Sequence, residues 1–131
     1  MQDPVRKGQL SRLKSRKSLE ALFKIKPKFT RDLRVHYVPS DEDGLLVAVS
    51  APKRRFKRAV DRNKIKRLLR EAVRLEYGQL QQPLHGECLI IFSGKEIPRL
   101  SELRKQLGLA LSKIFATQAL GQNKRKKNGS E

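Results

Sequence analysis

The chain has few of the residues that usually build a catalytic or metal site. Among 131 residues there are one cysteine, two histidines and no tryptophan. A single cysteine excludes an internal disulfide and a metal site with several cysteine ligands. His36 and His85 have no second histidine or cysteine at metal-ligand spacing. Cys88 adjoins the apolar run 89–92 and is interpreted as a small buried side chain. The acidic segment 41–43 indicates a solvated turn. We therefore predict no catalytic residue, no metal site and no cofactor bound by the protein itself.

Acidic residues and long apolar runs are also scarce. There are 13 Asp and Glu against 31 Lys and Arg, which gives a formal net charge of +18. Such a charge attracts polyanions, so nucleic acid is the first candidate partner and an anionic membrane surface the second. No stretch approaches the roughly 18 apolar residues of a spanning helix. The first residues lack the apolar core of a secretory signal. We therefore expect a cytoplasmic protein without a membrane partner.

Hydrophobic periodicity divides the chain into alternating helices and strands. Helices are predicted at 18–26, 59–77 and from Ser101 to about 120, and strands at 33–38, 45–51 and 87–93, with a further short strand near 28–30. The order α-β-β-α-β-α, with that optional further β, predicts an α/β (α+β) sandwich around a single sheet. We expect a flexible N-terminus over 1–10, one domain over 11–120 and a disordered basic tail over 121–131.

Half of the net charge lies in 22 residues. The segment 53–74 holds eleven Lys and Arg and two acids, a net charge of +9. As a helix, its later part places apolar side chains on one face: Ile65, Leu68, Leu69 and Ala72. The roughly opposite stripe is polar and cationic: Asn63, Lys66, Arg67, Arg70 and Arg74.

A solvated helix face would also be charged, but such faces usually mix signs because like charges repel at i,i+4. This stripe contains no acid, and a polyphosphate partner would relieve its self-repulsion. Arginine binds phosphate through two parallel hydrogen bonds, so the stripe predicts a nucleic-acid contact. A single-stranded segment would need an aromatic or apolar platform beside the charge. Phe23 and Tyr37 are candidates for that platform, and packing in the core is their alternative role.

The segment 59–72, AVDRNKIKRLLREA, closely resembles the signature of the bacterial ribonuclease P protein family. In that family an Arg-Asn-Arg helix is followed by an apolar residue and a Lys-Arg pair, as in 65–67 here. The strand and basic linker over 47–56 match too, as does Arg12-Leu13-Lys14 leading into Phe23-Lys24. The resemblance covers roughly residues 10–118. Two positions differ, because Lys64 replaces the third residue of the triplet and Leu19 stands where members often carry an aromatic.

The resemblance implies a four-stranded sheet with a left-handed β-α-β crossover and two RNA-binding surfaces. The basic helix and its linker would face a catalytic RNA through Lys53, Arg54, Arg55, Arg58, Arg62, Asn63, Lys64, Lys66, Arg67, Arg70 and Arg74. A cleft between the first helix and the sheet would hold the single-stranded 5′ leader of precursor tRNA through Leu19, Phe23, Tyr37 and Val49.

The implied function is that of the protein subunit of ribonuclease P, a ribonucleoprotein endonuclease that removes the 5′ leader of precursor tRNA. Its partners would be the catalytic RNA subunit and precursor tRNA, with no protein partner evident, and Mg²⁺ would belong to the RNA active site. One alternative is a structural RNA-binding protein of the ribosomal type. Another is a self-sufficient nuclease, which would require clustered acids or histidines that are not evident in this sequence.

Overall fold

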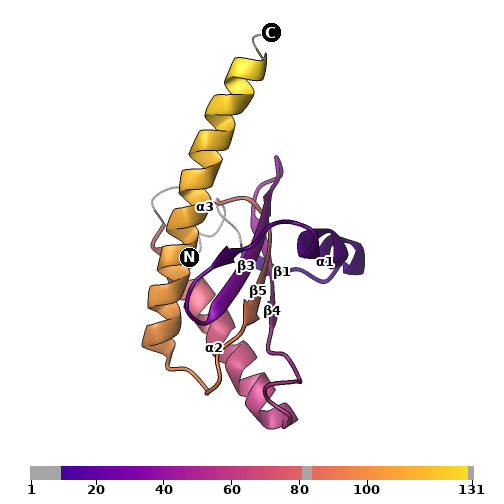
Figure 1. Cartoon of the computed structure of the whole chain (residues 1–131), viewed down its shortest axis with the longest axis vertical. Helices are drawn as coiled ribbons and strands as arrows, with labels where there is room; N and C mark the ends of the chain where they lie inside the picture. Colours follow the sequence, from indigo (N-terminus) through magenta and orange to yellow (C-terminus); the bar gives the residue numbers. More distant parts are fainter. Residues whose placement is uncertain (1–9, 81–83, 130–131) are drawn as a thin grey trace.

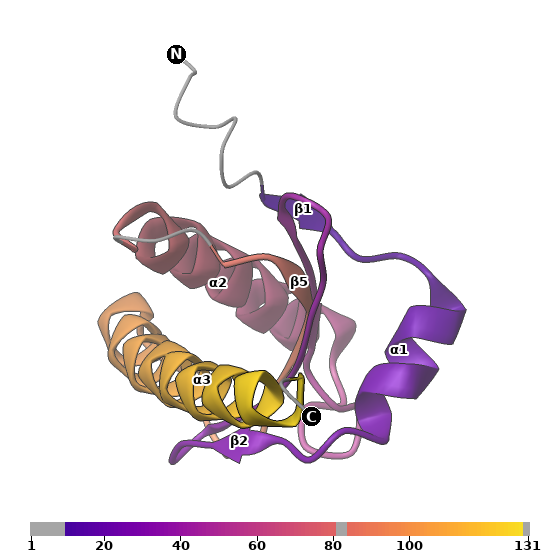
Figure 2. The same cartoon turned by 90° about the horizontal axis from the view of Figure 1, so that it is seen from above.

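The computed structural model describes residues 10–80 and 84–129, with side chains described as far as residue 116. A single sheet separates the helices into two layers: α1 covers one face, and α2 and α3 cover the other (Figures 1 and 2). In chain order the elements are β1 (Leu10–Arg12), α1 (Arg16–Phe23), β2 (Lys28–Phe29), β3 (Leu33–Pro39), β4 (Leu45–Ser50), α2 (Ala59–Gly78), β5 (Gly86–Phe92) and α3 (Leu100–Gly129).

The strands lie in the order β1-β4-β5-β3-β2. The middle strand, β5, is parallel to β4 and antiparallel to β3. The parallel neighbours β4 and β5 are joined through α2, because two parallel strands need a crossover connection, usually a helix. This arrangement confirms the predicted α+β sandwich with one sheet. The left-handed sense of the crossover stays a prediction.

The described sheet has five strands, whereas the sequence predicts four. The additional strand, β1, pairs in parallel with β4 from Leu10 opposite Leu45 to Arg12 opposite Val47. Its three residues contain a single apolar side chain, so they show no alternation that would predict a strand. The pairing is set by a partner more than thirty residues away, which local sequence does not reveal. Leu10 therefore belongs to the sheet and not to a flexible N-terminus, and residues 1–9 of that predicted segment lie outside the described residues.

The main core lies between the sheet and the pair α2 and α3. Side chains at alternate positions of β4, such as Leu45 and Val47, join it together with Ile65 and Leu69 of α2. The residues between them in β4 point to the opposite face, where Leu46 packs in a smaller cluster under α1. Both faces of β4 are covered, which explains its nearly continuous apolar sequence.

The last helix is longer than its sequence predicts. Periodicity and Gly121 suggest an end near residue 120, followed by a disordered tail, but α3 continues to Gly129 (Figure 1). One glycine costs a helix only about 1 kcal/mol relative to alanine and does not force an end. The lysines, arginine and glutamine that follow are good helix formers. Residues 130 and 131 of the predicted tail lie outside the described residues. Within the described part of the chain, no helix is both long and apolar enough to cross a membrane.

Candidate nucleic-acid interface

Helix α2 separates its apolar and cationic side chains as the sequence predicts. Its buried residues, among them Ile65, Leu69 and Ala72, face the sheet and α3. Asn63, Lys64, Arg67, Arg70 and Arg74 are exposed, while Arg62 and Lys66 are half-buried. The helix begins with Asp61 in its first turn, where an acid favours the positive end of the helix dipole.

The basic linker before α2 is held by one aromatic anchor. Phe56 is buried, and its ring centroid lies 5.9 Å from that of Phe92 in β5. The backbone N–H groups of Arg55 and Phe56 both donate to the carbonyl of Pro52, which bends the linker into a turn. The predicted contacts in this linker are all exposed around the anchor: Lys53, Arg54, Arg55 and Arg58. The linker and the exposed side of α2 therefore form one cationic surface.

Arg62 has a different role from the exposed arginines of α2. Its Nη1 donates hydrogen bonds to the carbonyl oxygens of Phe56 and Lys57, each at 2.8 Å. Helix α2 lacks a side-chain cap at its start, and Arg62 reaches back across that start to the linker. The guanidinium therefore holds the linker in place, in addition to adding positive charge.

Strand β1 adds a cation that the sequence pattern did not assign to this surface. Partial loss of hydration at the base of its side chain lowers the pKa of Arg70, although the residue is exposed, and the positive charge of Arg12 lowers that pKa further. Arg12 follows Leu10 by two residues, and Leu10 packs in the core beneath α2 and α3, so Arg12 projects from the same face of the sheet. The repulsion between Arg12 and Arg70 is a reason for this surface to bind an anion.

Arg74 is already paired within the protein. Its Nη2 lies 2.5 Å from Oε2 of Glu71, and its Nε donates to Oε1 of the same carboxylate at 3.2 Å. This hydrogen bond raises the pKa of Arg74 and lowers that of Glu71. Arg67, by contrast, makes no hydrogen bond or ion pair with any described residue. Arg67 is consequently the more available of the two for a partner.

The structure does not bring the four predicted cleft residues together. Leu19 packs against the small apolar cluster under α1, and Phe23 is 53% exposed at the end of α1. Tyr37 and Val49 pack instead on the main core, on the opposite face of the sheet. The hydroxyl of Tyr37 donates to the carbonyl oxygen of His85. Because successive strand residues point to opposite faces, the predicted placement of Tyr37 and Val49 in the cleft is wrong, and their neighbours in β3 and β4 face α1 instead.

The residues that share the face of Phe23 are Arg34 and His36 of β3. The ring centroids of Phe23 and His36 lie 5.8 Å apart. Arg34 donates from Nε to Nε2 of His36 at 3.1 Å. Phe29 of β2 lies opposite Arg34 in the antiparallel pair and is 59% exposed. The face predicted to form the cleft therefore carries two exposed aromatic rings, with a half-buried arginine and a buried histidine between them.

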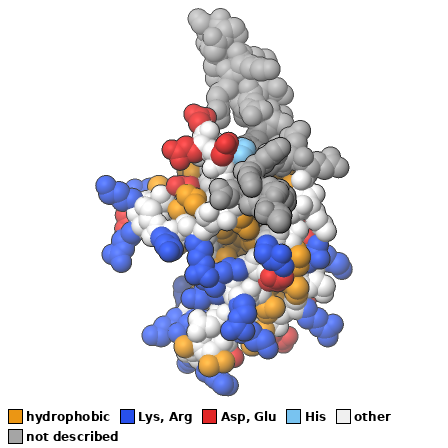
Figure 3. Space-filling model, turned by 180° about the vertical axis from the view of Figure 1, so that it is seen from behind, with side chains coloured by type: hydrophobic (Ala, Val, Ile, Leu, Met, Phe, Trp, Pro, Cys, Tyr) orange, Lys and Arg blue, Asp and Glu red, His pale blue; other side chains and the backbone are white. Residues whose placement is uncertain are grey.

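Charge is unevenly distributed over the surface. Figure 3 shows Lys and Arg side chains spread over the middle and lower parts of one face, while one cluster of Asp and Glu lies near the upper edge of the coloured part and a few others lie among the cations. The exposed acidic turn 41–43 joins β3 to β4, and the basic linker follows the opposite end of β4.

In the described part of the chain, no group of three or more His, Cys, Asp or Glu could hold a metal ion.

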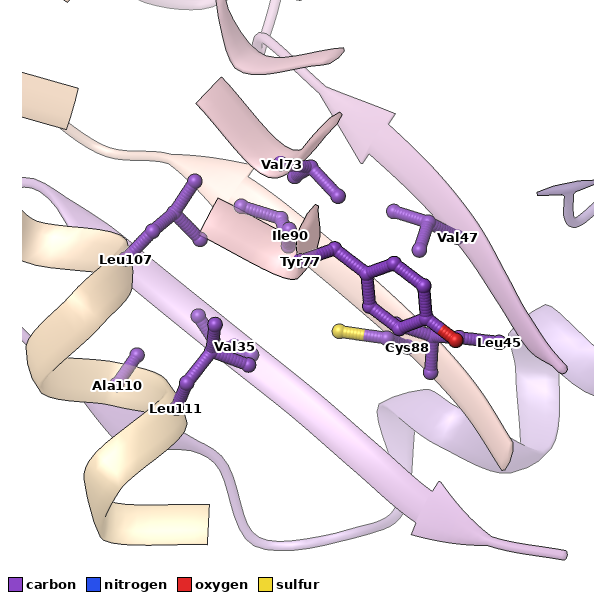
Figure 4. A pocket seen from close by; sticks show the side chains of 10 residues that line it. All are labelled: Val35, Leu45, Val47, Val73, Tyr77, Cys88, Ile90, Leu107, Ala110 and Leu111. Carbon is purple, nitrogen blue, oxygen red and sulfur yellow. The ribbon is translucent and has the colours of Figure 1, made fainter. Parts of the chain in front are cut away.

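A small hollow between the sheet, α2 and α3 is not a ligand site of useful size (Figure 4). Its volume of about 20 Å³ has room for about one water molecule, and apolar atoms line it. Tyr77 closes part of the hollow, and its hydroxyl donates to the carbonyl of Leu84. The hollow is therefore a packing gap in the core.

Comparison with known proteins identifies relatives of this chain. The family model for ribonuclease P matches residues 8–115. A ribonuclease P protein component from Nitrosococcus oceani is 45% identical over 53 residues, which are 40% of this chain and 41% of that protein. The match therefore spans about two fifths of the length of that relative.

Solved structures share the fold. The RNase P protein of Staphylococcus aureus matches with a TM-score of 0.64 and 21% identity, over 77% of this chain and 92% of that chain. The RNase P protein of Thermotoga maritima matches with a TM-score of 0.63 and 24% identity, over 73% of this chain and 90% of that one. At these identities the likeness concerns the fold alone. The family model covers well over half of the sequence, and the chain therefore belongs to the ribonuclease P protein family.

Proposed function

We propose that this chain is the protein subunit of ribonuclease P and assists a catalytic RNA in removing the 5′ leader of precursor tRNA. The observation that carries the proposal is that two different surfaces lie on the two sides of one sheet, the linker and α2 on one side and the face beneath α1 on the other. The cationic surface of the linker and α2 is suited to a folded RNA, because exposed arginines bind phosphates. The face beneath α1 is suited to single-stranded RNA, because exposed aromatic rings stack bases beside positive charge.

The chemistry is assigned to the RNA. Hydrolysis of a phosphodiester needs an activated water and stabilised oxyanions, usually supplied by metal ions held by clustered ligands. Among the described residues, the exposed acids of the 41–43 turn lie at the end of β4 away from the basic linker. Mg²⁺ would be used by the RNA active site. The protein would contribute leader binding and neutralisation of phosphate charge, which raise affinity for the precursor.

A substitution on the face beneath α1 tests the leader-binding part of this proposal. Phe23→Ala removes an exposed ring that makes one ring contact, with His36. We expect precursor tRNA to bind the holoenzyme about 5- to 100-fold more weakly, as for the loss of a stacked base. Mature tRNA, which has no leader, should bind as before.

Tyr37→Phe is the matched control, because it removes a hydroxyl from an aromatic side chain on the other face of the sheet. We expect this variant to lose some stability and to keep its preference for precursor over mature tRNA. Equal affinity of the Phe23→Ala holoenzyme and the unsubstituted holoenzyme for precursor tRNA would contradict leader binding at this face.

A further inference from the structure

Aromatic and nitrogen-containing side chains form one continuous row on the sheet face beneath α1. Phe29 and Arg34 are direct partners in the antiparallel pair β2–β3, so they project from the same face. His36 follows Arg34 on that face two residues along β3. The ring of Phe23 then contacts His36, with an angle of 58° between the two planes. The order along the row is therefore Phe29, Arg34, His36 and Phe23.

His36 is fixed in one tautomer by its two hydrogen bonds. The side chain is fully buried, and its Nδ1 lies 2.8 Å from the carbonyl oxygen of Ile25. A carbonyl can only accept, so Nδ1 carries the proton. Nε2 is then unprotonated and accepts the hydrogen bond from Nε of Arg34. The segment after α1 therefore orients His36, and His36 in turn orients Arg34.

Arg34 presents the rest of its guanidinium to a partner. One edge is used by the bond from Nε to His36, and the two Nη nitrogens have no partner among the described residues. The guanidinium is planar, so fixing Nε also fixes the direction of both Nη groups. A guanidinium held in this way is prepared to bind a phosphate with little further loss of side-chain freedom.

Phe29 is held by its backbone while its ring remains exposed. Lys113 of α3 donates from Nζ to the carbonyl oxygen of Phe29 at 2.8 Å. The neighbouring Thr30 donates its hydroxyl to Oε1 of the buried Gln106, which also accepts from the N–H of Asp32. These bonds fix the β2–β3 turn against α3. The exposed ring of Phe29 is thus presented from a rigid support and not from a mobile loop.

We propose that Arg34 binds one phosphodiester of the single-stranded leader, with bases stacked on Phe23 and Phe29 on either side. His36 is a positioning residue that holds the guanidinium toward that phosphate. This inference rests on the proposed function, in which the leader lies on this face. It assigns a phosphate to Arg34 and not a base edge, because the flanking rings supply the surfaces for bases.

The test uses the holoenzyme with precursor tRNAs that carry one uncharged methylphosphonate at successive leader linkages. For the unsubstituted protein, we expect one linkage at which neutralisation weakens binding about tenfold or more, as for the loss of a hydrogen bond to a charged group. Arg34→Gln, which leaves His36 in place, should weaken binding of the unmodified precursor to a similar extent. It should also abolish the sensitivity at that linkage. Arg31→Gln is the matched control and should retain the sensitivity, since Arg31 pairs with Asp32 and Glu102.

His36→Phe tests the positioning role, because it keeps the ring and removes both hydrogen bonds. We expect precursor affinity to fall about threefold to tenfold, with no further loss when it is combined with Arg34→Gln. The Nε–H resonance of Arg34 in the free protein should lose its protection from solvent exchange. A melting curve shows separately whether the fold is intact, and Arg34→Gln remains informative if this variant does not fold.

The outcomes distinguish a failure of leader binding from a failure of the phosphate subsite at Arg34. Equal affinity of the unsubstituted holoenzyme for precursor and mature tRNA would overturn leader binding itself. A clear preference for precursor without any linkage sensitivity that depends on Arg34 would overturn only the phosphate subsite. Additive losses in the double variant, or an Arg34 Nε–H signal unchanged by His36→Phe, would overturn the positioning role of His36.

Discussion

Substitution of Arg62 should lower both the stability of the protein and its affinity for RNA, and comparison with Arg67 separates the two effects. Its Nη1 makes two hydrogen bonds to the carbonyls of Phe56 and Lys57 at 2.8 Å. Hydrogen bonds from charged groups contribute about 1.5–3 kcal/mol each when buried. Because Arg62 is only half-buried, water offsets part of this contribution, and we expect Arg62→Ala to lower the free energy of unfolding by about 1–2 kcal/mol. For a domain of this size the melting temperature should fall by roughly 3–8 °C.

Arg67→Ala is the matched comparison, because Arg67 is exposed and unpaired among the described residues. Its unfolding free energy should stay within about 0.5 kcal/mol of the original protein. Both variants should bind the catalytic RNA more weakly, Arg67→Ala by about 1.5–3 kcal/mol through a lost hydrogen bond to a charged phosphate. Thermal unfolding and RNA titration at fixed salt measure the two effects. A melting temperature of Arg62→Ala equal to that of Arg67→Ala would refute the claim that Arg62 holds the linker.

Three further predictions concern the free protein. Gly86 has φ of 142°, and a Cβ there would collide with the carbonyl oxygen of Val38. Gly86→Ala should therefore lower the free energy of unfolding by about 3 kcal/mol or more in a denaturant titration, and a near-neutral effect would contradict this. Burial raises the pKa of the Cys88 thiol to about 12. A thiol reagent at pH 8 should therefore modify Cys88 only in molecules that have unfolded, and rapid labelling of the native protein would contradict this. Sulfate should raise the melting temperature more than chloride at equal ionic strength, because bound anions relieve the repulsion between Arg12 and Arg70; identical curves would argue against an anion-binding surface.

The sequence predicts the regular elements well, because their apolar periodicities are strong. The face of α2 that carries Ile65 and Leu69 is buried, and the exposed cations lie on its other side, as the spacing indicates. Strand β1 is different, since three residues with one apolar side chain carry no periodic signal. Its pairing with β4 depends on the folded sheet, and so does the approach of Arg12 to Arg70.

The face beneath α1 differs from β1, because the sequence of β3 does contain the alternation that defines it. Leu33, Val35 and Tyr37 form the alternating apolar set and therefore belong on the core face. Arg34 and His36 occupy the other parity, which is the face shared with Phe23. In β3 the alternation of apolar residues, and not the aromatic type of Tyr37, determines the face on which Tyr37 lies. The proximity of Phe29 to Arg34 could not be derived in the same way, since it depends on the register of a two-residue strand.

The most direct test of the central claim compares cleavage of precursor tRNA by three preparations. These are the protein alone, the ribonuclease P RNA of the same cell alone at near-physiological Mg²⁺, and the two combined. We predict no cleavage by the protein, slow cleavage by the RNA and faster cleavage by the combination, with the gain arising from tighter binding of the precursor. Each tenfold gain in affinity corresponds to about 1.4 kcal/mol. Cleavage at the mature 5′ end by RNA-free protein, or no gain on combining the two, would contradict the account.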